Sequence, residues 1–291
     1  MILEYISKIK TKASIYSKKR SYNVLDGSYI SIYKGSSQNF EDLREYIPGD
    51  NVRDIDWKAS SRNRSLLVRR YVAEKKHNIM IVFDSGAKMR AYTEAGKVKK
   101  DIAILSGGLF AYLAAKNGDN VGCIFNNGDL ISFFQLKMGL YNAERILTEY
   151  DKDAEKITNY SLDRIMEYLI KNIKRRMVIL VVTDAKGLDA ITENNLKKLT
   201  YQHDILFINI GEAYYTQKNA FSVNNDQYIP EFITTNRRLR RQEQEARDII
   251  VSKNSKKLKN LGIMEVTIQD EDEVAEKLND LLERHKYASN R

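Results

Sequence analysis

Ile79-Met80-Ile81-Val82-Phe83-Asp84 is a run of five apolar residues that ends in an aspartate. A second run of the same kind, Met177-Val178-Ile179-Leu180-Val181-Val182, reaches Asp184 after one threonine. Strands that are apolar on both faces are typical of parallel sheets that are covered by helices on both sides. The two runs therefore predict two core strands of such a sheet.

The elements around these runs support the same fold. We expect further strands at 121–125, 130–134, 205–210 and 263–268, and helices at 95–116, 141–150, 162–175, 193–200, 231–251 and 270–286. This alternation predicts a three-layer α/β fold with a mostly parallel, Rossmann-like sheet between two layers of helices.

The first quarter of the chain has a different pattern. Residues 3–20 are expected to form a basic amphipathic helix, Asp26-Gly27 predicts a β-hairpin, and residues 66–72 are expected to be a strand. We therefore divide the chain into an N-terminal helix and hairpin arm at 1–76 and an α/β domain at 77–291.

The composition argues against several classes of protein. The single cysteine, Cys123, rules out an internal disulfide framework, and no apolar run reaches the roughly 18 residues of a membrane-spanning helix. The first residues lack the apolar block of a signal peptide, so we expect a cytoplasmic protein. The three histidines are far apart in sequence and no nucleophile motif is present, which argues against an enzyme.

The net charge of +9 is concentrated in two zones. Residues 1–78 carry a net charge of +7 and residues 235–260 carry +6, whereas residues 261–291 carry −4. Basic zones of this kind favour an acidic partner, which could be a protein, a nucleic acid or an anionic membrane surface. A solvated surface without a partner is the other interpretation.

Asp84 and Asp184 each follow the carboxyl end of an expected strand, where ligands bind in parallel sheets. Two carboxylates there provide the oxygen ligands that Mg²⁺ requires. Alternatively, each aspartate caps the helix that follows it by accepting backbone N–H groups. The occurrence of two such residues favours a shared polar site.

The most distinctive sequence in the chain is the segment 35–60. Its Pro48-Gly49 pair suits a type II turn, because proline fixes one φ angle and glycine accepts a positive one. This segment, continued by matches up to Glu74, resembles the signature of the domain of unknown function 58 family. The signature residues that we single out are Arg44, Tyr46, Pro48, Gly49, Asp50, Arg53, Asp56, Trp57, Arg62 and Arg69.

These signature residues alternate in charge around Trp57, the only tryptophan. In one interpretation they form an internal ion-pair network with a buried aromatic anchor that holds the arm onto the sheet. In the other they are a docking surface in which Trp57 and the arginines contribute most of the binding energy.

From residue 77 onward the order of elements is similar to that of a von Willebrand factor A domain. The resemblance implies a metal site built from an Asp-x-Ser-x-Ser turn, a threonine from a later loop and a second aspartate. Here Gly86 and Lys88 stand where the two hydroxyl ligands should be, and the loop at 137–140 has no threonine. We expect no cofactor, with bound Mg²⁺ as the alternative, and a degenerate metal site made of Asp84, Ser85 and Asp184, with Lys88 neutralising it.

Members of the family are bacterial proteins that are often encoded beside MoxR-type AAA+ ATPases. The resemblance implies a non-enzymatic, protein-binding adaptor or chaperone-like assembly factor that works with such an ATPase. Two alternatives stay open. The protein could bind nucleic acid or another acidic surface through its basic zones, or it could be a divalent-metal-dependent phosphoesterase that uses Asp84 and Asp184.

Overall fold

The structure is a computed structural model that describes residues 2–18, 39–63, 65–72, 76–158, 160–216, 221–222 and 227–289. The predicted hairpin at Asp26-Gly27 and the first residues of the signature segment, 35–38, lie outside the described residues. Glu74, at the end of that signature, also lies outside them.

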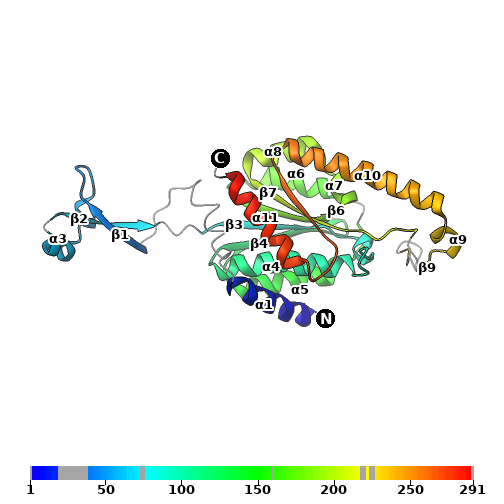
Figure 1. Cartoon of the computed structure of the whole chain (residues 1–291), viewed down its shortest axis with the longest axis horizontal. Helices are drawn as coiled ribbons and strands as arrows, with labels where there is room; N and C mark the ends of the chain where they lie inside the picture. The colour runs from blue at the N-terminus through cyan, green and yellow to red at the C-terminus, as the bar shows by residue number, and fades with distance from the viewer. Residues whose placement is uncertain are drawn as a thin grey trace.

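A six-stranded sheet forms the centre of the molecule, in the order β10-β7-β6-β3-β4-β5 (Figure 1). Neighbouring strands are parallel except for the antiparallel pair β4 and β5. The bounds are β3 (Asn78–Phe83), β4 (Asn120–Asn127), β5 (Leu130–Lys137), β6 (Val178–Asp184), β7 (Asp204–Ile210) and β10 (Met264–Ile268). The predicted mostly parallel sheet is confirmed, and the two apolar runs are its adjacent central strands β3 and β6.

Helices cover both faces of this sheet, as the apolar strands require. One face carries α1 (Ile2–Lys18), α4 (Lys99–Lys116), α5 (Leu140–Asp153) and α11 (Val274–Ser289). The other carries α6 (Leu162–Asn172), α7 (Ala185–Asp189), α8 (Glu193–Gln202) and α10 (Arg237–Asn260). Alternate residues of β3 serve the two cores, because successive side chains of a strand point to opposite faces: Ile81 packs towards α4 and Met80 towards α6.

Helix α4 is buried along most of its length and packs closely on its neighbours. A Cβ atom at Gly107 would collide with the ring of Phe83, and one at Gly108 would lie 2.6 Å from Ile9 Cδ1. The absence of a side chain at both glycines therefore permits this close packing. It brings the first turn of α4 against the carboxyl ends of the central strands.

The N-terminal helix does not belong to the arm in which we placed it. Tyr5, Ile9 and Ala13 of α1 are buried in the same core as α4, because the amphipathic helix has an apolar stripe that the α/β body covers. Lys8 also pairs with Glu271, at 3.0 Å, before α11. The predicted boundary at residue 76 is therefore wrong for α1, which is part of the α/β body.

A small unit remains of the predicted arm. Antiparallel β1 (Asn39–Glu45) and β2 (Leu67–Val72) flank the short helices η2 (Val52–Asp54) and α3 (Trp57–Asn63). We call residues 39–63 and 65–72 the signature unit. Figure 1 shows it apart from the α/β body, so the interpretation in which it is held onto the sheet is not what the structure shows.

The basic helix is longer than expected. α9 (Glu231–Thr234) ends one turn after it begins, and α10 then runs without a break to Asn260. Asn236 explains the restart, because its side chain accepts hydrogen bonds from the amides of Arg238 and Leu239. The remaining short elements are η3 (Ala87–Arg90), β8 (Phe221–Ser222) and β9 (Gln227–Tyr228). Within the described ranges, no helix has the length and apolar character needed to cross a membrane.

Candidate functional site

Asp84 and Asp184 lie side by side at the carboxyl ends of β3 and β6. The register pairs Phe83 with Val182, and the amide of Asp84 donates to the carbonyl of Val182 at 2.9 Å. Both aspartates are buried, with 4% and 1% of their surface exposed. Thr183, which precedes Asp184, donates its hydroxyl hydrogen to Asp84 Oδ2 at 2.5 Å. The strand order thus creates the shared polar site that the sequence predicted.

Lys88 is the first cation in this site. It lies on η3, the short helix after Asp84, and its Nζ is 2.5 Å from Asp84 Oδ2 and 3.4 Å from Asp184 Oδ1. Its side chain is about one third exposed, at 35%. Lys88 therefore bridges the two carboxylates from the solvent side of the site.

Lys99 is a second cation, which the sequence analysis did not identify. It begins α4, and its Nζ lies 2.9 Å from Asp184 Oδ2 and 3.0 Å from Glu212 Oε1, with none of its side chain exposed. Nothing in the sequence distinguishes Lys99 from its neighbours Lys97 and Lys100, which are partly exposed. Only the packing of α4 across the sheet selects it.

Backbone groups complete the coordination of the aspartates. Asp184 caps α7 by accepting from the amide of Gly187 at 2.7 Å, so the capping interpretation and the shared site are both present at this residue. Asp84 Oδ1 accepts from the amide of Ser85 at 2.8 Å. The hydroxyl of Ser85 is directed away and donates to the carbonyl of Asn126 at 2.6 Å.

Gly187 is required where these groups converge. A Cβ atom at this position would overlap the Thr183 hydroxyl and the Asp84 carboxylate, and it would lie 2.8 Å from Lys88 Nζ. Any side chain would therefore displace the buried charges. The role of this glycine could not be predicted from the sequence either, because it depends on a strand that is distant in the chain.

The carboxylates and ammonium groups of the site shift one another's pKa values. Burial has the largest effect on the pKa of Asp84 and raises it, against the attraction of Lys88. Burial alone would also raise the pKa of Asp184, but the charges of Lys88 and Lys99 outweigh it and lower that pKa. Burial opposes the charge on Lys88, yet the two carboxylates raise the pKa of its ammonium group. Asp184 is thus ionised and Lys88 protonated at neutral pH.

The residues present do not fit a divalent cation. Ammonium groups contact the carboxylate oxygens that a Mg²⁺ ion would need, and the Ser85 hydroxyl donates elsewhere. No group of three or more His, Cys, Asp or Glu residues suited to a metal occurs in the part of the chain that the structure describes.

The loop from which we expected a threonine is in a different place. In the strand register, Lys137 lies opposite Val121, near the start of β4. The loop at 137–140 is therefore at the amino ends of β3 and β4, whereas Asp84 is at the carboxyl end of β3. The reason is that β5 is antiparallel and carries the chain back. The loop that faces the Asp84 turn follows α5, where Gly86 donates to the carbonyl of Ala154 and Thr158 lies beside Gly86.

Ion pairs hold the turn of the signature unit. Nη1 and Nη2 of Arg44 donate to the two oxygens of the Asp50 carboxylate, at 2.7 and 2.6 Å. Asp50 also accepts from the amide of Ile47, and Arg44 lowers the pKa of the Asp50 carboxyl. The bond from the Asp50 amide to the Ile47 carbonyl and the φ of +111° at Gly49 fit the predicted turn after Pro48.

A second ion pair holds α3 against β2. Asp56 accepts from the amide of Ala59 in the first turn of α3, and its other oxygen accepts from Arg69 Nε at 3.0 Å. Tyr46 contributes its main chain, because its amide donates to the carbonyl of Leu66 at 2.8 Å. The signature charges thus organise the unit locally, as the ion-pair interpretation predicted.

Trp57 is not the buried anchor of that interpretation. It is 63% exposed, and Ile47 and Val52 are 60% and 58% exposed. Arg53 and Arg62 are exposed as well. The ion pairs therefore support apolar and basic side chains that point to solvent.

A family model described as "Protein of unknown function DUF58" matches residues 42–216. The chain belongs to this family. Uncharacterized proteins from Mycobacterium bovis and Mycobacterium tuberculosis are 22% identical to this DUF58 chain over 195 residues. The match covers 66% of this chain and 61% of each relative, which is less than two thirds of their length.

Solved structures similar to this DUF58 chain share little sequence with it. The conserved hypothetical protein BatB from Bacteroides thetaiotaomicron is 12% identical and has a TM-score of 0.43, covering 72% of this chain and 98% of its own. A von Willebrand factor type A structure from Catenulispora acidiphila is 11% identical with a TM-score of 0.43, covering 88% and 52%.

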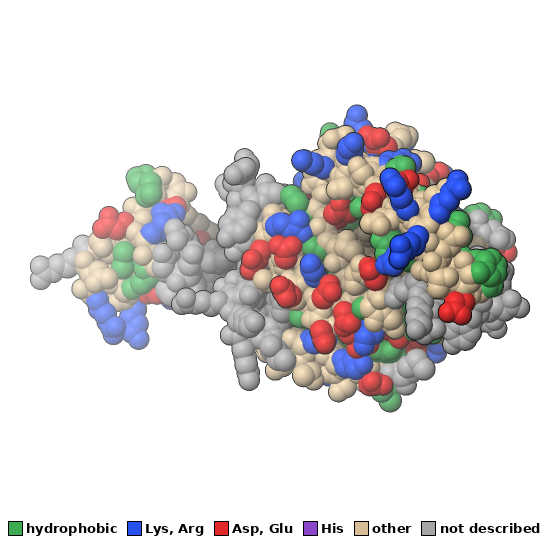
Figure 2. All heavy atoms as spheres, turned by 45° about the vertical axis from the view of Figure 1, so that its right-hand side comes forward, with side chains coloured by type: hydrophobic (Ala, Val, Ile, Leu, Met, Phe, Trp, Pro, Cys, Tyr) green, Lys and Arg blue, Asp and Glu red, His purple; other side chains and the backbone are tan. Residues whose placement is uncertain are grey.

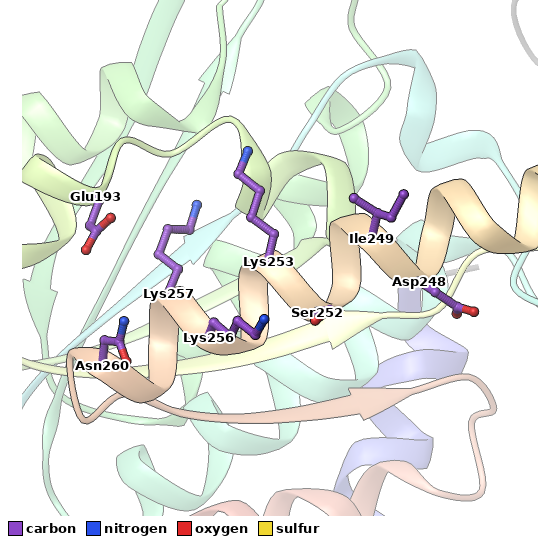
Figure 3. A pocket seen from close by; sticks show the side chains of 8 residues that line it. All are labelled: Glu193, Asp248, Ile249, Ser252, Lys253, Lys256, Lys257 and Asn260. Carbon is purple, nitrogen blue, oxygen red and sulfur yellow. The ribbon is translucent and has the colours of Figure 1, made fainter.

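The DUF58 match contains most of the signature unit and both aspartates, whereas α10 lies beyond it. A groove lies between α10 and α8, with Lys257 and Ile249 on one side and Glu193 on the other (Figure 3). Lys257 is buried and donates to the carbonyls of Leu188 and Ile191, at 2.8 and 2.9 Å. Its contacts therefore attach α10 to the body.

Proposed function

We propose that this DUF58 protein is a non-enzymatic, protein-binding adaptor that engages its partner through the exposed face of the signature unit. The observation that supports this proposal is the 63% exposure of Trp57 beside an ion-paired, ordered turn. Large exposed apolar side chains on a supported frame are characteristic of interaction sites.

The physical argument concerns what the frame does for binding. The Arg44–Asp50 and Asp56–Arg69 pairs hold the turn and α3 before a partner arrives. A preformed surface loses less conformational freedom when it binds. Tryptophan and arginine are also the residues that most often dominate binding energy, and Trp57 has exposed arginines close to it in sequence.

The buried site of the α/β body is consistent with a role other than catalysis. Its two aspartates are paired with lysines, and the proposal assigns them a structural role. The proposed partner is a MoxR-type AAA+ ATPase, which the family resemblance implies, and the proposed location is the cytoplasm. The exposed arginines suit a partner surface with an apolar depression and an acidic rim.

Binding of the full-length protein to a purified MoxR-type ATPase from the same genome tests the proposal. We expect Trp57→Ala to weaken binding at least about 30-fold, the effect of losing a dominant contact. Tyr201→Ala is the matched control, because Tyr201 is a 91% exposed aromatic residue on α8, outside the signature unit. Equal affinities for the two variants, or absence of binding by the unaltered protein, would contradict the proposal.

The basic end of α10 supports nucleic-acid binding as a second candidate. Four exposed arginines occupy the first turns of this helix: Arg237, Arg238, Arg240 and Arg241. Figure 2 shows basic side chains gathered at the upper right of the view, on the side where α10 lies in Figure 1. Cations at a helix N-terminus oppose the helix dipole, so their position is unfavourable for stability and favours a role in binding.

Fluorescence anisotropy with a DNA duplex at several salt concentrations tests this candidate. If arginines contact the phosphates, the affinity for DNA should fall steeply as the salt concentration rises. The double variant Arg238→Glu and Arg241→Glu should lose DNA binding. The control is Lys152→Glu on α5, which reverses the charge of a 60% exposed side chain elsewhere. Salt-independent binding, or equal effects of the variants, would exclude the candidate.

A further inference from the structure

Two carboxylates in the interior need nearby positive charge. Asp84 and Asp184 are almost completely buried. The Asp84 carboxylate accepts from the hydroxyl of Thr183, and the Asp184 carboxylate accepts from the amide of Gly187. Burying two negative charges that contact the same ammonium group is strongly unfavourable unless cations and hydrogen bonds compensate. A protein can supply that charge with a bound ion or with its own side chains.

In this chain the compensating positive charges are those of two lysine side chains. Lys88 contacts both carboxylates from the solvent side, and Lys99 contacts Asp184 from the interior side. Lys99 also pairs with Glu212 after β7, which extends the network to a third strand end. Both lysines follow Asp84 within one segment, so the segment that provides the first carboxylate also provides the two ammonium groups of the site.

The Lys88 ammonium group occupies the space between the two carboxylates, so a metal ion cannot bind there while Lys88 is in place. Its Nζ is 2.5 Å from Asp84 Oδ2, and Gly187 closes the other side of the same space. Lys99 is fully buried, whereas Lys88 is partly exposed and lies at the entrance. Removal of Lys88 would thus open the carboxylates to solvent and would leave Lys99 in position.

We propose that Lys88 and Lys99 act as tethered substitutes for a divalent cation, and that the Lys88 ammonium alone closes a latent cation site formed by Asp84, Asp184 and Thr183. The protein keeps the carboxyl ends of β3 and β6 ordered without metal. This role is independent of the docking function proposed for the signature unit.

Thermal unfolding of the full chain with millimolar Mn²⁺ or with EDTA tests the proposal, with Mn²⁺ binding followed by electron paramagnetic resonance. The unaltered protein is expected to have the same Tm in both solutions. Lys88→Ser removes one counter-charge of two buried carboxylates and is expected to lower Tm by roughly 10 °C in EDTA. Mn²⁺ is expected to restore part of this loss, because an ion that binds only the folded state raises Tm.

Two further variants make the result specific. Adding Asp84→Asn to Lys88→Ser removes the excess negative charge, and it should recover stability in EDTA while abolishing Mn²⁺ binding. Lys152→Ser is the control, because Lys152 is 60% exposed and pairs with Glu149 on the surface of α5. It should leave Tm and the Mn²⁺ signal unchanged.

Two outcomes would overturn the proposal. One is binding of Mn²⁺ by the unaltered protein that is lost in Asp84→Asn. The other is a Lys88→Ser variant whose Tm does not respond to Mn²⁺. If Lys88→Ser does not fold in EDTA, its refolding yield replaces Tm as the readout: recovery with Mn²⁺ supports the proposal, and failure to recover overturns it.

Discussion

The ammonium group of Lys99 lies 2.9 Å from Asp184 Oδ2, and the two residues are separated by 85 positions in the chain. Neither side chain is more than 1% exposed. This contact ties the first turn of α4 to the end of β6, while α4 itself covers β3. The charged site therefore also connects α4 to the sheet.

We expect Lys99→Met to lower the free energy of unfolding by about 3 kcal/mol, because Asp184 loses a buried counter-charge. Urea denaturation at neutral pH measures the change. Lys152→Met replaces a 60% exposed lysine and should change stability by no more than about 0.5 kcal/mol. If the two substitutions had the same effect, the contact with Asp184 would not contribute to stability.

Gly187→Ala should destabilise the protein by about 3 kcal/mol or more, because its methyl group overlaps Thr183 and Asp84. Alanine normally favours a helix, so propensity alone predicts the opposite sign. Ala190→Ser, at the exposed end of the same short helix, is the control. A neutral or stabilising Gly187→Ala would show that the charged groups can move apart.

Tyr150→Phe tests the support of the Asp84 main chain. The phenol donates to the Asp84 carbonyl at 2.7 Å, and its ring stacks on Phe83 with centroids 4.2 Å apart. Phenylalanine keeps the ring but leaves a buried carbonyl without this donor, which should lower the free energy of unfolding by about 1–3 kcal/mol. Tyr201→Phe on the surface should have no measurable effect, and a similarly silent Tyr150→Phe would exclude the proposed support.

His203 should make the protein sensitive to moderate acid. It is 1% exposed, neither ring nitrogen has a hydrogen-bond partner among the described residues, and burial lowers its pKa to about 4. The unfolded chain then binds the proton more readily, so stability is lost as pH falls from about 6.5 towards 4, by up to roughly 3 kcal/mol.

Denaturation of His203→Leu between pH 8 and pH 4 checks this expectation. The variant should lose less stability than the unaltered protein over the acid range. The pKa of His285 is also lowered by burial, so some acid sensitivity should remain. Parallel stability curves for the two proteins would contradict the assignment to His203.

Most of the fold could be predicted because its signals are local. The all-apolar strands β3 and β6, the alternation of helix and strand, and the turn at Pro48-Gly49 depend on residues close together in the chain. The assignment of α1 to an arm was wrong for the opposite reason. An amphipathic stripe shows that a helix packs on something, but it does not show on what.

The exposure of Trp57 was likewise not predictable from the pattern around it. Alternating charges near a tryptophan suit both a buried anchor and a supported surface. The outcome depends on whether another layer of the protein covers the side chain. In Figure 1 the signature unit stands apart from the α/β body.

The amino-acid sequence alone indicated that Asp84 and Asp184 each lie at the end of an apolar strand and that Lys88 follows Asp84 closely enough to pair with it. The tertiary structure alone decided that Lys99, Glu212 and Gly187 complete the site. The reason is that the order of the strands and the packing of α4 on the sheet bring together side chains from distant segments. Electrostatic compensation inside a protein follows distance in space, which local sequence does not encode.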